Sequence, residues 1–166
     1  IGVSTKSASR CFDELEYLNI DVLGMKGKSR VINIPDDREQ LWQQIENVLR
    51  NPVIRRFVLR EDKKLEKKAG ISALCEYSLL SDNVYPTYAV TKKELKDSGV
   101  KVEKQVSELE EIGCVVLELG YFIDFLGKGF QDPLSVVLSF TGEEQEEERV
   151  DISINEMLEE YVWSKD

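Results

Sequence analysis

The first third of the chain has a pattern of apolar and polar positions that predicts a helix followed by a hairpin. The apolar positions of the helix recur at spacings of four, three and three residues and are Ala8, Phe12, Leu15 and Leu18. Ser4 or Thr5 can cap its N-terminus. Residues 20–23 and 30–34 alternate apolar and polar side chains on either side of a glycine-containing stretch, residues 24–29. This alternation around a turn predicts a β-hairpin.

The polar side of the predicted helix and the tip of the predicted hairpin carry groups that suit nucleic acid. Thr5, Lys6, Ser9, Arg10 and Asp13 lie opposite the apolar face, and small hydroxyl and cationic side chains can reach base edges and phosphates in a major groove. The hairpin tip holds three cations, namely Lys26, Lys28 and Arg30. Taken by itself, the helix could equally be an ordinary amphipathic surface helix. The cationic hairpin that follows it favours a winged helix.

Three short motifs in this region resemble the turn and recognition helix of bacterial winged helix-turn-helix regulators of the MarR type. They are Ile1-Gly2-Val3-Ser4, Ser7-Ala8-Ser9-Arg10 and Phe12-Asp13-Glu14-Leu15-Glu16. The resemblance implies double-stranded DNA as partner and a DNA-facing set on the helix and the wing: Ser4, Thr5, Lys6, Ser7, Ser9, Arg10, Lys26, Lys28 and Arg30. It also implies that the chain begins inside the motif, because the first two helices of such a fold would precede Ile1.

A helix and a cationic stretch are expected next. Asp36 and Asp37 suit the start of a helix whose apolar stripe runs to Leu49, before Pro52. Residues 52–69 are rich in Lys and Arg and are expected to connect two domains. They could extend a phosphate-contacting surface, or they could be a solvated linker that contains a short strand of Val53, Phe57 and Leu59.

The remaining residues, 70–166, predict an acidic α/β domain. Helices are expected over residues 71–80, after Thr91, over 102–112 and over 147–162, and strands over 85–90, 114–123 and 134–140. Gly127-Lys128-Gly129 is interpreted as a turn, because it lacks the other glycines of a phosphate-binding loop. The fold class is therefore α+β: a partial winged helix with the following helix over residues 1–51, the basic connector over 52–69, and a small α/β sandwich.

The acidic domain has a resemblance of its own. The motifs Ser72-Ala73-Leu74, Tyr77-Ser78 and Pro86-Thr87-Tyr88, with the following strand and acidic terminal helix, look like the second domain of winged-helix proteins akin to abortive-infection antitoxins. That resemblance implies a regulatory or partner-binding role and carries no established cofactor.

Composition narrows the chemistry. The 166 residues include no histidine, so a Ser-His-Asp triad, a Cys-His dyad and an HExxH zinc site are excluded. The net charge is −10, but it is unevenly divided, with +3 up to Lys68 and −13 beyond it. Such asymmetry suggests that only the first part attracts a polyanion. Three cysteines without a CxxC pair and no long apolar run indicate a cytoplasmic protein without a membrane span.

These features favour a DNA-binding regulator that has no catalytic residues and needs no cofactor or metal. A two-fold dimer is expected, because operators of such regulators are palindromic. The first alternative is an antitoxin-like protein-interaction module that binds a basic partner through the acidic domain. The second is a metal-dependent nucleotidyltransferase-like enzyme that uses carboxylates. The candidate carboxylates for that enzyme are Glu108, Glu110, Glu111 and those of residues 143–148.

Overall fold

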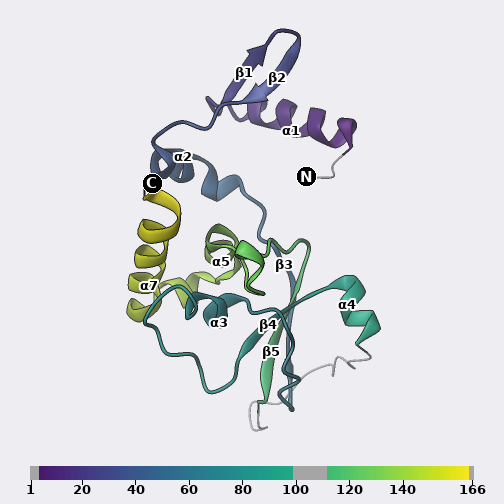
Figure 1. Cartoon of the computed structure of the whole chain (residues 1–166), viewed down its shortest axis with the longest axis vertical. Coiled ribbons are helices and arrows are strands. Elements are labelled where there is room, and N and C mark those ends of the chain that lie inside the picture. Colours follow the sequence, from purple (N-terminus) through teal and green to yellow (C-terminus); the bar gives the residue numbers. More distant parts are fainter. Residues whose placement is uncertain (1–3, 99–111, 165–166) are drawn as a thin grey trace. The chain divides into compact units, whose positions relative to one another are not determined.

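The computed structural model describes residues 4–98 and 112–164 and has an α+β fold that divides into two units, Ile1–Leu49 and Arg50–Asp166 (Figure 1). The first unit contains α1 (Thr5–Tyr17), β1 (Leu23–Lys26), β2 (Ser29–Ile32), α2 (Arg38–Ile45) and the 3-10 turn η1 (Glu46–Val48). The second unit contains a three-stranded sheet and a group of helices. Each unit is described by itself below.

Local signals start the elements of the first unit where the sequence predicts them. Ser4 caps α1, since its Oγ accepts a hydrogen bond of 3.1 Å from the backbone N–H of Ser7. Asp37 caps α2 in the same way through Gln40, at 2.9 Å. The strands β1 and β2 pair antiparallel, and Gly27 takes a positive φ of 65° at the first position of their two-residue turn. A glycine there is the preference of a type II′ turn, so the hairpin turn is encoded locally.

The second unit is built on a mixed sheet. Its elements are β3 (Val53–Leu59), α3 (Gly70–Leu74), β4 (Thr87–Thr91), α4 (Lys92–Asp97), β5 (Cys114–Leu119), η2 (Phe125–Gly127), α5 (Pro133–Ser139), α6 (Gly142–Gln145), α7 (Glu148–Leu158) and the π-helical turn η3 (Glu159–Trp163). The strand order is β3-β5-β4, with β5 antiparallel to β3 and parallel to β4. The predicted partly antiparallel sheet is therefore confirmed.

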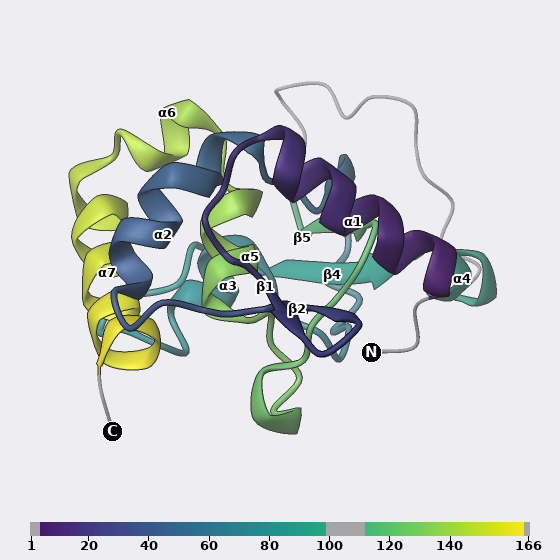
Figure 2. The same cartoon turned by 90° about the horizontal axis from the view of Figure 1, so that it is seen from above.

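Three buried clusters stabilise this unit. The helices α3, α5 and α7 pack around one of them, and Figure 2 shows α3 and α5 at one end of β4. One side of the sheet contributes Phe57, Leu59, Tyr88, Val90, Cys114 and Val116. The other side contributes Ala89, Leu117 and Leu119, which form a cluster with Ala69. Because β5 supplies buried residues to both sides of the sheet, this strand lies at the centre of the unit.

Two predicted elements of the second unit are wrong in type or length. Residues 134–139 belong to the helix α5 instead of a strand, because Asp132 Oδ1 accepts a 3.1 Å hydrogen bond from Ser135 N and Pro133 takes the first helical position. The helix expected over residues 71–80 ends at Leu74, and Leu79 is fully exposed. The helix expected over 102–112 falls almost entirely outside the described residues.

The expected connector belongs to the second unit. Residues 52–69 supply β3, which pairs along its length with β5, and Lys68 forms an isolated bridge with Tyr88 of β4. The short strand considered for Val53, Phe57 and Leu59 is thus present, as part of a sheet. In the described part of the chain, no helix is both long enough and apolar enough to cross a membrane.

Candidate nucleic-acid interface

The helix α1 exposes the side that the sequence assigns to DNA. Ala8, Phe12 and Leu15 are half-buried, whereas the predicted DNA-facing residues Ser4, Thr5, Lys6, Ser7 and Arg10 are all exposed. Lys6 and Arg10 are one helical turn apart and therefore lie on the same side of the helix. This side offers two cations and several hydroxyl groups to a polyanion.

The hairpin presents two further cations. Lys26 ends β1, Lys28 occupies the second position of the turn, and both side chains are exposed. Within the first unit, residues 4–12 and 22–35 contain no acidic side chain. The helix start and the hairpin tip are thus local patches of positive charge.

Arg30 is used differently from the other predicted residues. It lies on β2, and its Nη1 donates to Asp13 Oδ1 at 2.7 Å while its Nη2 donates to Ser9 Oγ at 2.8 Å. Its guanidinium also stands 4.9 Å from the centre of the Phe12 ring, which is a cation–π contact. The structure therefore turns two predicted DNA-facing residues, Ser9 and Arg30, toward each other.

Sequence reasoning missed two members of this surface. Asp13 was placed on the polar face but not recognised as the acceptor for Arg30, 17 residues away. Tyr17 is 89% exposed at the last position of α1. Its spacing of seven residues from Arg10 places it on the same side of the helix, which is the signal that could have identified it.

The observed boundary between the units changes the division of charge that was expected from a boundary at Lys68. With the boundary at Leu49, the first unit has six basic and eight acidic residues, a net charge of −2, and the second unit carries −8. The excess of cations up to Lys68 comes from residues 50–68, which belong to the second unit. Within the first unit, positive charge is therefore concentrated in the local patches on α1 and the hairpin.

Most of the cations in residues 50–68 are paired within the second unit. Arg55 Nε donates to Glu118 Oε2 at 2.6 Å, and this carboxylate is only 3% exposed. Three further ion pairs connect this segment to later parts of the same chain: Arg56–Glu144, Lys67–Glu94 and Lys68–Glu76. These ion pairs join the segment to β5, α6, α4 and the residues after α3, so most of its cations already have acidic partners within the second unit.

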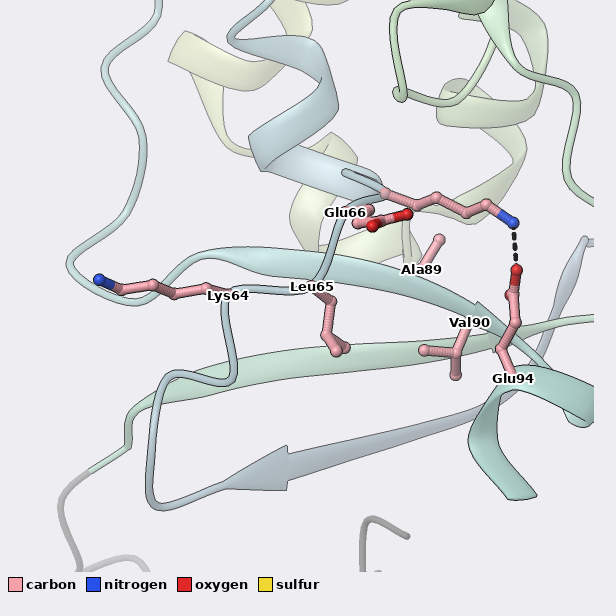
Figure 3. A pocket seen from close by; sticks show the side chains of 7 residues that line it. Lys64, Leu65, Glu66, Ala89, Val90 and Glu94 are labelled. Atoms are coloured by element: carbon pink, nitrogen blue, oxygen red, sulfur yellow. Dashed lines mark hydrogen bonds and ion pairs between the residues drawn. The ribbon is translucent and has the colours of Figure 1, made fainter. Parts of the chain in front are cut away.

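A small hollow of about 280 Å³ lies beside β4 and α4. Figure 3 shows Lys64 pointing away from Glu94. The apolar side chains of Leu65 and of Val90, a residue of β4, also line the hollow. Lys67 Nζ bonds Glu94 at 2.5 Å, and this bond together with the Thr91 backbone N–H lowers the pKa of Glu94 to about 2. Because Lys67 and Glu94 neutralise each other, the hollow offers no unpaired charge at this pair to a ligand.

The side chains proposed for metal chemistry are not gathered in the described structure. Among residues 4–98 and 112–164, no three Cys, Asp or Glu side chains are placed to hold a metal ion. In the acidic run, the Glu144 carboxylate accepts a hydrogen bond from the backbone N–H of Thr141, the N-cap of α6, and pairs with Arg56. Glu108, Glu110 and Glu111 lie outside the described residues. Burial raises the pKa of the Cys75 thiol to about 11, so this cysteine is a poor nucleophile.

Comparison with known proteins adds no assignment. No family model, no curated protein and no solved structure matches the chain.

Proposed function

We propose that this protein is a transcription regulator that binds double-stranded DNA with α1 in the major groove and the β1–β2 hairpin on the adjacent backbone. The observation that carries the proposal is the pair of exposed cation patches, Lys6 with Arg10 on the helix and Lys26 with Lys28 on the hairpin. A helix and a neighbouring hairpin with these charges match the two contact modes of a winged helix. A cytoplasmic location and a two-fold dimer on a palindromic site belong to the same proposal.

The residues have different roles in this proposal. Arg10 contacts a base edge, because a guanidinium can donate two hydrogen bonds to guanine. Lys6, Lys26 and Lys28 contact phosphates, and each phosphate contact adds about 0.9 to the slope of log affinity against log salt. At the start of the helix, hydroxyl groups that can bind the DNA backbone come from Ser4, Thr5 and Ser7. Tyr17 can donate its hydroxyl to a phosphate farther along.

The test uses the full chain and a duplex recovered from a random-sequence pool by repeated selection, with a scrambled duplex of the same composition beside it. Arg10→Ala should weaken binding to the selected duplex by about 1–3 kcal/mol and reduce the preference over the scrambled one. Lys28→Ala should weaken binding to both duplexes and lower the salt slope by about 1.

Lys96→Ala is the control for these variants, because Lys96 is an exposed lysine of α4 in the second unit. It should leave affinity for both duplexes unchanged. The proposal is refuted by a wild-type chain that binds selected and scrambled duplexes equally, or by Arg10→Ala and Lys28→Ala variants that behave like Lys96→Ala.

The second unit supports an alternative function, the binding of a cationic protein. A hollow of about 680 Å³ beside α7 and η3 is lined by the acidic residues Glu76, Glu156, Glu159 and Glu160. Leu79 at its rim is fully exposed and could contact an apolar group. Under this alternative, the double change Glu156→Lys and Glu159→Lys should abolish binding of the purified protein encoded by the neighbouring reading frame, and DNA binding should stay unchanged.

A further inference from the structure

We infer that Arg30 and Asp13 are positioning residues, which fix the angle between α1 and the hairpin so that both cation patches meet one stretch of DNA. The inference rests on the proposed function, since it concerns how the DNA-contacting parts are held. It assigns to Arg30 a role that differs from the phosphate contact implied by its charge.

The hairpin is joined to α1 at two points along the helix. The first is the chain connection itself: Ile20, three residues before β1, donates its backbone N–H to the carbonyl of Leu15 at 3.1 Å and so fixes the exit from the helix end. Arg30 makes the second attachment, and its contact with Ser9 lies six residues upstream of Leu15, or about 9 Å along the helix axis. Two attachments at this separation restrict rotation of the hairpin about the helix end, which one attachment would allow.

The contacts of Arg30 suit an arginine and no other cation. Ser9 and Asp13 are one helical turn apart, and the guanidinium spans them with two different nitrogens while it stacks on Phe12. A lysine ammonium is a point charge that cannot bridge both acceptors and stack in the same way. Arg30 lies opposite Met25 in the ladder, one pair before Lys26 with Ser29, so its position directly sets the position of the hairpin tip.

This pair contributes little to stability, because Asp13 and Arg30 are 63% and 37% exposed and exposed ion pairs are weak. Its effect on DNA binding can therefore be measured in a folded protein. Asp13 makes the measurement decisive. A carboxylate beside DNA repels phosphates, so its removal should strengthen binding if Asp13 were only a nearby charge. If Asp13 positions the hairpin, its removal should weaken binding.

The experiment measures binding of the full chain to the selected and scrambled duplexes by fluorescence anisotropy. Asp13→Ala and Arg30→Lys should each weaken binding to the selected duplex by about tenfold and reduce its preference over the scrambled duplex. The double variant should be no weaker than either single variant, because each change breaks the same attachment. A thermal melt of each variant confirms that it is folded at the assay temperature.

Glu14→Ala is the matched control, since Glu14 is an exposed carboxylate on the same helix and its removal changes the charge equally. It should bind as tightly as wild type or more tightly. An Asp13→Ala variant that behaves like Glu14→Ala overturns the positioning role but leaves DNA binding intact. An Arg30→Lys variant with wild-type affinity and salt slope identifies Arg30 as a plain phosphate contact. A wild-type chain without preference for the selected duplex contradicts the proposed function itself.

Discussion

The two units use their charged and apolar residues in opposite ways. In the first unit, α1 has no fully buried residue, its cations are exposed, and the ion pair between Arg30 and Asp13 lies at the surface. In the second unit, three buried clusters surround the sheet and helices, and the cations of residues 50–68 pair with acidic residues far along the chain. The difference indicates that the second unit carries most of the stability, whereas the first presents a surface.

One tryptophan in each unit allows this comparison to be measured. Trp42 is buried in the first unit, and Trp163 packs against the helical cluster of the second. Since the chain contains two tryptophans, Trp42→Phe leaves Trp163 as the single reporter, and Trp163→Phe leaves Trp42. Fluorescence during urea unfolding then follows each unit separately.

The largest effect is expected from Leu117→Ala in the central strand. Leu117 is fully buried, so the change should lower the free energy of unfolding reported by Trp163 by about 2–5 kcal/mol. Leu79→Ala is the matched control, because Leu79 is fully exposed and the same atoms are removed; it should change stability by less than about 0.5 kcal/mol. Equal effects of the two changes would contradict a core centred on β5.

A smaller and asymmetric effect is expected from the pair on β3 and β5. Arg55→Met leaves the Glu118 carboxylate, 3% exposed, without its cation, and should destabilise the second unit by about 2 kcal/mol. Glu118→Gln removes the buried charge and leaves Arg55, 56% exposed, in contact with water, so it should cost less. Urea unfolding reported by Trp163 measures both. If Glu118→Gln costs more than Arg55→Met, desolvation of the carboxylate is not the dominant effect.

The smallest effect is expected from Glu94, whose pKa is lowered from about 4.5 to about 2 by its bond with Lys67 and by the Thr91 backbone. A lowered carboxyl pKa stabilises the fold above the unfolded pKa, and this contribution is lost as the pH falls from about 4.5 to about 2. Because the side chain is 44% exposed, the contribution should be only about 0.5 kcal/mol. Glu94→Gln should be less stable than wild type at pH 7, and the difference should shrink as the pH falls toward 2 and vanish below it. A difference that is constant with pH would exclude the ionised carboxylate as its source.

Features encoded by neighbouring residues could be predicted from the sequence. Ser4 caps α1, Gly27 forms the hairpin turn, and Thr91 caps α4, and in each case the signal lies within a few residues of the feature. Residues 134–140 show the limit of this approach. Their apolar, valine-containing pattern fits a buried strand as well as a buried helix, and the helix-start signal of Asp132 and Pro133 lies just before the expected strand.

Contacts between distant residues could not be predicted. The charge of residues 52–69 suggested a solvated connector, because composition does not reveal that their partners are Glu118, Glu144 and Glu94. The candidate interface has the same limit. Arg30 looked like a surface cation beside Lys26 and Lys28, and its contact with Asp13 exists only once the hairpin has folded back on α1.

The position of β3 determines where the protein can be cut for separate study of its parts. A fragment that starts at residue 70 would lack this strand and leave the backbone N–H and C=O groups of β5 unpaired along one side. An open, apolar strand edge is a template for intermolecular pairing, so such a fragment should aggregate. A fragment that starts near Arg50 retains the outer strand and is the better candidate for soluble expression.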